Sequence, residues 1–453
     1  MTQDRPGTRI PVRTKIVYSL GDHTVNLVLS SLSLFYLFFL TDKVGLAPVL
    51  AGAVPWIARS VDAITDPVMG RISDHTRWRA GRRRPWFLIG ALPFGLCFAL
   101  LWVTVPFDSE LAQFAYYTSV YVLLSLAMTV VSVPYLALIP EMARDYDDRT
   151  SFNTWRSALG IVAVFFAVGM SSLADALGDD AAAWSYAAWI VSVWLVLPWL
   201  PVWAVSWERP VESPPAMGFR EGLRTLLNHA AYRNLATFYL LARTALDIVS
   251  AMFLFYIARV IGRPDDFEIT LTFFLFVVVA ALPMWLMLAQ RFDKRGVFLL
   301  GVCWWIGAQL LMLFGGPEWP RWAMFAVAGF AAVGYAVADL MPWSMLPDVI
   351  DEDELETGER REGLYNGSFT FLRKVGGATA VLLAGLVLQL AGYDGELERQ
   401  PESAVTAIRV MMGVVPAVLL GASAWLARRY PMSREAHREI LARLAHRATS
   451  TRR

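Results

Sequence analysis

The feature that most constrains this chain is a series of long apolar segments that recurs along nearly its whole length. Each segment reaches about 20 residues, the length that an α-helix needs to cross the hydrocarbon core of a bilayer. Hydrophobic residues make up 56% of the 453 residues and charged residues only 17%, against about 25% in soluble domains. This composition excludes a soluble enzyme and predicts a polytopic membrane protein.

Apolar windows between charged breaks predict about twelve membrane-spanning helices in two sets of six. The expected spans are residues 16–40, 49–72, 85–106, 113–139, 152–175, 183–206, 235–260, 268–290, 297–315, 321–346, 366–391 and 403–427. We therefore expect an all-α membrane protein with a cytoplasmic N-terminal segment (1–15), an N-terminal six-helix bundle (16–207), a central linker (208–234), a C-terminal six-helix bundle (235–430) and a basic tail (431–453).

Charge sets the expected orientation of these spans. Basic residues gather at the N-terminus, in the loop 77–84 and in the tail after Arg428, whereas the alternate loops lean acidic. Cytoplasmic loops carry such an excess of Lys and Arg, so both termini and the central linker are predicted to be cytoplasmic. The net charge is +1, which gives no indication of a nucleic-acid partner.

The two halves carry similar motifs, which indicates pseudo-symmetry. A proline, an aromatic residue, a second proline and an acid follow in that order at 134–141 and again at 342–348. These positions close the expected fourth and tenth spans. Parallel repeats with a solute site at their interface, near the middle of the bilayer, are a known plan of transporters.

Two carboxylates lie within the expected second span. Asp62 and Asp66 are four residues apart, so both project from one face of a helix. An ionised carboxylate at bilayer depth is costly and faces a cavity or a partner rather than lipid. A bound cation would neutralise this face, and close carboxylates also suit reversible protonation. A structural alternative pairs Asp62 with Arg59, but it leaves Asp66 unexplained.

Polar residues in other spans suggest a solute site. Tyr18, Asp22 and Asn26 follow at intervals of four in the first span and share one helical face. Arg156 in span five and Lys374 in span eleven are the main cations expected to face a central cavity. Both cations are therefore candidates for solute contact.

Three further charged residues fall within the second half. Arg243 and Asp247 are four apart and are expected to satisfy each other. Asp339 has no clear partner in the sequence and is a candidate functional residue by default. A structural interpretation of Lys374 makes it the partner of Asp22 or of Asp339.

Seven segments resemble the glycoside–pentoside–hexuronide:cation symporters, a family of the major facilitator superfamily. They are residues 18–22, 62–70, 81–86, 133–135, 145–150, 347–351 and 357–374. The resemblance extends from about residue 15 to about residue 430 and is most specific at 62–70. Residues 345–393 also resemble the sodium-dependent lysophosphatidylcholine symporters.

The resemblance implies the ligands of a coupling ion. It assigns ion binding to Asp62 and Asp66, with Thr65 and Thr129 as further candidates. Na⁺, like other hard cations, should prefer carboxylate, hydroxyl and carbonyl oxygens, so Na⁺ is preferred here over H⁺. No cofactor other than this coupling ion is expected.

The resemblance also implies a solute pocket. The family's two sugar-binding acids appear here as Asn26 and Ser132, and its stacking tryptophan appears as Leu136. Trp343 or Tyr135 is then the candidate for the aromatic surface, although aromatic residues of membrane proteins more often serve in packing or as interface anchors. The expected substrate-binding residues, from the first span and the resemblance together, are Tyr18, Asp22, Asn26, Ser132, Arg156, Trp343 and Lys374.

The third implication of the resemblance is a cytoplasmic gate. In related transporters an acid and an arginine loop clamp the cytoplasmic faces of the two halves when the outside is open. The expected gate residues are Asp74, Arg77, Arg82, Arg83, Arg84, Glu141, Asp145, Asp348 and Asp351. Alternatively the arginines set only the topology, and the two roles are compatible.

These observations predict a secondary active symporter of the plasma (inner) membrane that works by alternating access and moves a sugar, glycoside or uronide with Na⁺ or H⁺. A sodium-dependent lysophospholipid symporter is the alternative. Two cations with few acids suit an anionic group, which is either the phosphate of a lysophospholipid or the carboxylate of a uronide. A non-transporting receptor or scaffold is an alternative of another class, which has no need for paired intramembrane acids. The expected partners are the solute or lysolipid and the bilayer, with the protein as a monomer and not an enzyme.

Overall fold

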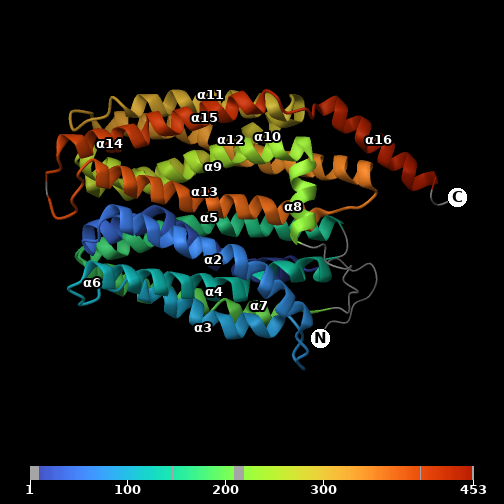
Figure 1. Ribbon diagram of the computed structural model, residues 1–453, viewed down its shortest axis with the longest axis horizontal. Helices are drawn as coiled ribbons and strands as arrows, with labels where there is room; N and C mark the ends of the chain where they lie inside the picture. Colours follow the sequence, from blue (N-terminus) through green and yellow to red (C-terminus); the bar gives the residue numbers. More distant parts are fainter. Residues whose placement is uncertain (1–9, 144–145, 209–218, 398, 451–453) are drawn as a thin grey trace. The chain divides into compact units, whose positions relative to one another are not determined.

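The computed structural model describes residues 10–143, 146–208, 219–397 and 399–450. Within these ranges the regular elements are helices, and β pairing is limited to one isolated bridge between Trp78 and Gly81. Long apolar segments satisfy their backbone polar groups inside a bilayer only as helices or closed barrels. The predicted all-α fold class is confirmed, and Figure 1 shows its helices.

The chain divides into two compact units. Unit 1 contains Met1–Ser213 with Asp394–Glu396, and unit 2 contains Pro214–Tyr393 with Leu397–Arg453. The division after Ser213 falls inside the segment 208–234 that the sequence predicts as a linker.

Unit 1 contains α1 to α7, with two π-helical segments that extend α1. The bounds are α1 Val12–Ser31, η1 Leu32–Tyr36, η2 Phe39–Lys43, α2 Pro48–His75, α3 Arg84–Leu100, α4 Glu110–Met142, α5 Tyr146–Ala176, α6 Ala181–Val196 and α7 Trp199–Val205. Prolines in the first turns of α2 and α3 suit helix starts, because those N–H groups have no intrahelical partner. The expected sixth span is interrupted at Pro198, between α6 and α7.

Unit 2 contains α8 to α16 with two short segments, η3 and η4. The bounds are α8 Phe219–Asn228, α9 Ala230–Phe255, η3 Tyr256–Ile261, η4 Pro264–Asp266, α10 Phe267–Arg291, α11 Lys294–Met312, α12 Arg321–Thr357, α13 Glu362–Leu390, α14 Glu402–Met412, α15 Val414–Ala427 and α16 Arg434–Ser450. Gly358 ends α12 with a positive φ of 77°, which glycine adopts without strain. The expected twelfth span is divided at Gly413 into α14 and α15.

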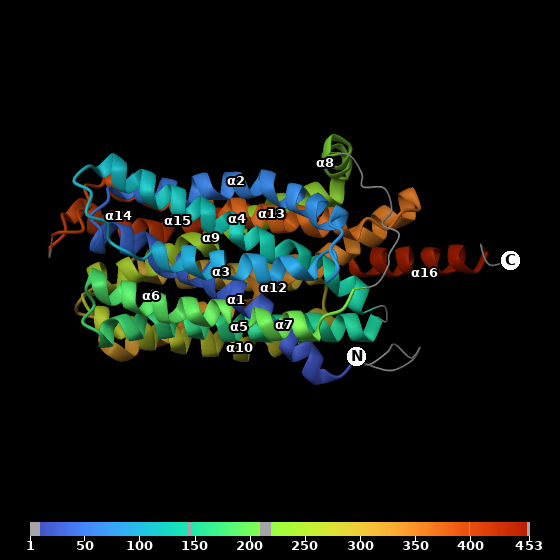
Figure 2. The ribbon, with the colours of Figure 1, turned by 90° about the horizontal axis from the view of Figure 1, so that it is seen from below.

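Helix packing differs between the two units. In unit 1, α1 packs on α5, and α4 packs on both α2 and α3; Figure 2 shows α3 beside α4. In unit 2, α9 packs on α12, α13 and α15, and Figure 1 shows it between α12 and α13. The apolar window of α9 is 83% buried, so α9 is the core helix of unit 2.

Nine helices of the described residues are long and apolar enough to cross a membrane. They coincide with the expected spans four to twelve. The first three expected spans are not among these nine. The first is divided into α1 and two π segments, and the second, α2, carries several charges. The third, α3, has only 17 residues. The expected total of twelve spans stays a prediction.

Candidate ion and solute sites

The first acid of α2 is buried beside a cation. Asp62 is 0% exposed, and Arg59 Nη1 donates a hydrogen bond of 3.0 Å to its Oδ2 atom. The two residues are three apart on one helix, which brings their side chains together. The ion pair that the sequence offers as a structural alternative is therefore present.

The second acid of α2 faces a different helix. Thr129 of α4 donates a hydrogen bond of 2.7 Å from its hydroxyl to Asp66 Oδ1, and Thr129 is only 2% exposed. The hydroxyl of Thr65 has a longer contact of 3.5 Å to the backbone carbonyl of Asp62. Thr129, rather than Thr65, is thus brought against a carboxylate.

These side chains form what we call the α2–α4 acid cluster: Arg59, Asp62, Asp66 and Thr129. Arg59 interacts electrostatically with both carboxylates. The formal charges of its three ionisable members sum to −1. Carboxylate and hydroxyl oxygens are the ligands that a hard cation prefers, so the cluster has the chemistry to take up one monovalent cation or one proton.

A second polar cluster joins α1 to α5. Arg156 Nη2 donates to Asp22 Oδ1 at 2.8 Å, and Asn26 Nδ2 donates to Asp22 Oδ2 at 3.0 Å. Arg156 Nη1 donates to Asn153 Oδ1 at 3.1 Å. The structure therefore brings together three of the predicted substrate residues and adds Asn153, which sequence reasoning missed. We call these four residues the α1–α5 polar cluster.

Two tyrosines pack beside this cluster in the core of unit 1. The Tyr18 hydroxyl donates to the Tyr135 carbonyl at 2.6 Å, and the Tyr135 hydroxyl donates to the Tyr18 carbonyl at 3.0 Å. Their rings stack with centroids 4.5 Å apart, and the Arg156 guanidinium lies 5.8 Å from the Tyr135 ring. Tyr18 is fully buried, so this geometry favours packing for it. Ser132 lies half-buried on α4, one turn before Tyr135.

The predicted residues of unit 2 lie near its core helix α9. Trp343 Nε1 donates to the Tyr239 hydroxyl at 3.1 Å, and its ring lies edge-on to Phe369 with centroids 5.3 Å apart. Lys374 is half-buried on α13. These contacts fix the orientation of Trp343 within unit 2.

A charge cluster of unit 2 joins α9 to α12. Arg243 donates to both carboxylate oxygens of Asp247, with one contact of 2.9 Å, which confirms that these residues satisfy each other. Arg243 Nη1 also donates to Asp339 Oδ1 at 3.2 Å. The sequence offers no partner for Asp339, because the contact crosses between two helices that are distant in the chain.

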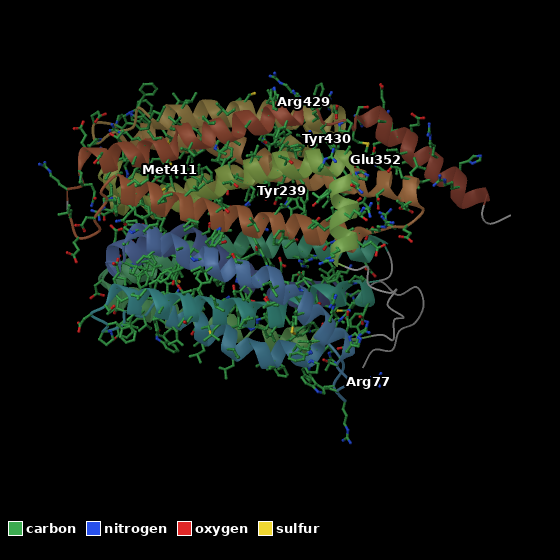
Figure 3. The ribbon with its side chains drawn as sticks, viewed as in Figure 1. Arg77, Tyr239, Glu352, Met411, Arg429 and Tyr430 are labelled. Atoms are coloured by element: carbon green, nitrogen blue, oxygen red, sulfur yellow. The ribbon has the colours of Figure 1, made fainter. Side chains whose placement is uncertain are left out.

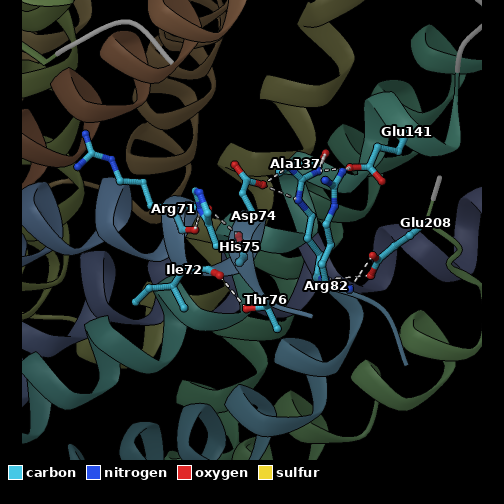
Figure 4. Close-up of polar contacts among 12 residues, drawn as sticks. Arg71, Ile72, Asp74, His75, Thr76, Arg82, Ala137, Glu141 and Glu208 are labelled. Carbon is cyan, nitrogen blue, oxygen red and sulfur yellow. Dashed lines mark hydrogen bonds and ion pairs between the residues drawn. The ribbon is translucent and has the colours of Figure 1, made fainter. Parts of the chain in front are cut away.

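The predicted gate residues of unit 1 form a network at the ends of α2, α3 and α4, shown in Figure 4. Arg83 Nε donates to Asp74 Oδ1 at 3.1 Å, and Arg83 Nη1 donates to the Ala137 carbonyl at 2.6 Å. Arg82 and Arg83 both pair with Glu141. Arg83 is 7% exposed, so this pairing is a buried crosslink within unit 1.

Glu208 completes this network and was missed by sequence reasoning. Its carboxylate accepts the backbone N–H groups of Arg82, Arg83 and Arg84 at 2.8, 2.9 and 2.8 Å. These groups precede or open α3, where the helix dipole favours a negative charge. Arg84 Nη2 donates to the Trp203 carbonyl at 2.8 Å.

The remaining gate candidates are placed as follows. Arg77 is exposed at the end of unit 1 (Figure 3). Lys294 Nζ contacts both oxygens of Asp348 at 2.8 and 2.7 Å. Asp351 accepts from Arg360 at 3.1 Å and lies 2.9 Å from His437. These acids thus have cationic partners within unit 2, and their gate role stays a prediction; Asp145 lies outside the described residues.

The family of the chain follows from its fold and sequence. A family model described as MFS/sugar transport protein matches residues 17–434. The chain therefore belongs to this family of the major facilitator superfamily. It is a multi-pass integral membrane transporter and not an enzyme.

Three relatives that are named as symporters align with nearly the whole chain. An uncharacterized symporter of Synechocystis sp. is 30% identical over 97% of this chain and 98% of its own length. The inner membrane symporter YicJ of Escherichia coli is 29% identical, over 93% of this chain and 92% of its own. The sodium-dependent lysophosphatidylcholine symporter 1-A of Danio rerio is 24% identical, over 94% of this chain and 87% of its own.

A solved structure agrees on the fold. A bacterial homolog to the human lysosomal transporter Spinster, inward-facing and occupied, superimposes with a TM-score of 0.69. The match covers 93% of this chain and 97% of the other, with 12% sequence identity. At that identity the likeness bears on the fold alone.

Proposed function

We propose that this transporter is a cation-coupled symporter in which the α2–α4 acid cluster binds the coupling ion, Na⁺ in preference to H⁺. The observation that carries the proposal is the pairing of Asp66 on α2 with the Thr129 hydroxyl on α4. An ion held by oxygens of two helices is sensitive to their relative position. Ion binding would therefore favour the conformation in which the solute site accepts its ligand. Solute binding must then tighten ion binding by the same factor.

For the solute we propose a sugar, glycoside or uronide, with a neutral glycoside preferred. In the α1–α5 polar cluster the Arg156 charge is already compensated by Asp22 at 2.8 Å. An anionic solute would have to compete with that carboxylate. A sugar hydroxyl instead finds a donor and an acceptor side by side, from the guanidinium, the carboxylate and the Asn26 amide. Membership in the MFS/sugar transport protein family supports the same class.

A lysophospholipid is the second candidate substrate. It is favoured by the relative from Danio rerio, whose name describes a sodium-dependent lysophosphatidylcholine symporter and which aligns with 94% of this chain. The two candidates differ in the contact they need. A phosphate requires that Arg156 release Asp22 or that Lys374 supply the positive charge.

Uptake into proteoliposomes tests the proposal. Purified protein is reconstituted, and an inward gradient of Na⁺ or of H⁺ is imposed with a panel of radiolabelled glycosides, uronides and lysophosphatidylcholine. We expect Na⁺ to drive accumulation of a glycoside above its external concentration. Accumulation driven only by H⁺ contradicts Na⁺ as the coupling ion. Accumulation of the lysolipid alone contradicts a glycoside as the solute. Binding without accumulation under either gradient would favour a receptor or scaffold.

A further inference from the structure

A cavity of about 230 Å³ lies at one end of unit 2, away from the two clusters described above. Its walls come from the end of α10, the start of α11, the second half of α12 and the first turns of α16. The residues that matter for its chemistry are Asp293, Lys294, Asp348, Tyr430, Arg434, His437 and Arg438.

A buried hydroxyl in the wall of this cavity lacks a hydrogen-bond partner. Tyr430 is 1% exposed, and its hydroxyl has no partner among the residues that the structure describes. Figure 3 labels Tyr430 close to Glu352, which is one of its charged neighbours. Burial, followed by the charges of Asp348, Glu352 and Asp293, raises the pKa of Tyr430. The hydroxyl therefore keeps its proton and needs an acceptor atom, because a buried donor left unsatisfied is costly.

Three cations (Lys294, Arg434 and Arg438) and two acids (Asp293 and Asp348) line the cavity, which gives a formal charge of +1 with His437 neutral. Asp348 is compensated by Lys294, whose Nζ lies 2.7 Å from it, and Asp293 lies 3.9 Å from Arg295 Nε. The α16 residues Arg434 and Arg438 are both exposed. Arg434 Nη1 donates to the Arg291 carbonyl at 3.1 Å, which keeps its guanidinium at this end of α10.

Part of the lining is apolar and lies where membrane helices end. Ala289, Met345 and Met432 line the cavity, and Phe292 beside them is 59% exposed. The spans α10 and α11 end and begin at Arg291 and Lys294, so the cavity is expected at the level of the lipid headgroups. Basic pockets at that depth suit anionic lipid headgroups.

We propose that this cavity binds the phosphate of an anionic membrane phospholipid, with Arg434 and Arg438 providing the positive charge and the Tyr430 hydroxyl donating a hydrogen bond. A free phosphate shares the headgroup chemistry, but the exposed Phe292 and the apolar lining give acyl chains a surface that a free phosphate does not use. The bound lipid also ties α16 to the ends of α10 and α11. The proposal does not depend on which solute is transported.

Lipid retention by the full-length protein tests the site. Protein in nanodiscs with equal amounts of phosphatidylglycerol and phosphatidylcholine of the same chain length is released into detergent and examined by native mass spectrometry. We expect phosphatidylglycerol to be retained about tenfold over phosphatidylcholine. The double variant Arg434→Gln/Arg438→Gln should lose about tenfold of this preference, and Tyr430→Phe at least about threefold.

A matched variant separates a built site from a merely basic helix. Arg443→Gln/Arg447→Gln removes the same charge from α16 at residues that do not line this cavity. We expect it to keep the preference within about twofold. An equal loss in this control, or no loss in the first double variant and in Tyr430→Phe, overturns the proposal. If millimolar inorganic phosphate displaces phosphatidylglycerol, the site binds free phosphate, and the assignment of a lipid as the ligand is wrong. Unfolding temperatures in phosphatidylcholine check that each variant is folded.

Discussion

Thr129 and Asp66 join α4 to α2 through a hydrogen bond of 2.7 Å from the threonine hydroxyl to the carboxylate. One turn earlier on α2, Asp62 is held by Arg59 at 3.0 Å. The two acids thus accept hydrogen bonds from different groups, Asp62 from a guanidinium of its own helix and Asp66 from a neutral hydroxyl of another helix. This difference makes Asp66 the better candidate for an exchangeable ion, because a hydroxyl can share a cation with a carboxylate.

Thr129→Val should weaken ion coupling while leaving the packing of α2 on α4 intact, because it replaces the hydroxyl by a methyl group. We expect the Na⁺ concentration for half-maximal uptake to rise about tenfold, the effect of one lost ligand or hydrogen bond to a charged group. Thr129→Ser keeps the hydroxyl and should stay within about threefold of the unmodified protein. An unchanged Na⁺ dependence in the valine variant removes Thr129 from the site.

Asp22→Asn should leave Arg156 with an uncompensated charge, because these side chains are only 18% and 20% exposed. We expect solute uptake to be lost and stability to fall by about 2 kcal/mol. Adding Arg156→Gln should restore the unfolding temperature but not uptake. Calorimetry of the two single variants and the double variant measures the coupling, and additive losses of stability contradict a direct pair.

Arg83→Gln should slow transport more than solute binding, because Arg83 connects Asp74, Glu141 and the Ala137 carbonyl at the ends of three helices. We expect the uptake rate to fall at least about tenfold, while the affinity for solute changes less than about threefold. The matched control is Arg79→Gln, in the same loop but exposed and not among the expected gate residues, which should keep uptake within about twofold. Equal losses in both variants would mean that the loop acts through its charge alone.

Arg243→Gln should destabilise unit 2, because it leaves Asp247 buried without the guanidinium that contacts both its oxygens. The expected loss is about 3 kcal/mol, measured by thermal unfolding. Asp339→Asn should lower the unfolding temperature less, since its single contact to Arg243 is 3.2 Å long and its side chain is 36% exposed. If Asp339→Asn proves the more damaging change, Asp339 has a role beyond this ion pair.

Much of the fold was predictable because span length and apolarity are local properties. The expected spans four to twelve coincide with helices of membrane-crossing length, and α8 lies within the expected linker. The interruptions at Pro198 and Gly413 were not predicted, since apolar residues continue on both sides of each. Mean hydropathy over a window of residues does not detect where a helix is interrupted.

The sites were predictable only as far as spacing along one helix determines neighbours. The pairs Arg59–Asp62 and Arg243–Asp247 follow from intervals of three and four residues. The contacts of Arg243 with Asp339 and of Glu208 with the start of α3 cross between distant segments. Such contacts depend on how each helix is rotated against its neighbour, which a single sequence does not record.

Na⁺-driven uptake by Asp66→Asn tests the central claim most directly, because this change keeps the side-chain shape and removes one charge from the α2–α4 acid cluster. Proteoliposomes with this variant are compared with the unmodified protein and with Asp108→Asn, a control at an exposed acid between α3 and α4. We expect an inward Na⁺ gradient to drive no accumulation in Asp66→Asn, while solute binding persists and Asp108→Asn behaves normally. Unchanged Na⁺-driven accumulation in Asp66→Asn would contradict the assignment of the coupling ion to this cluster.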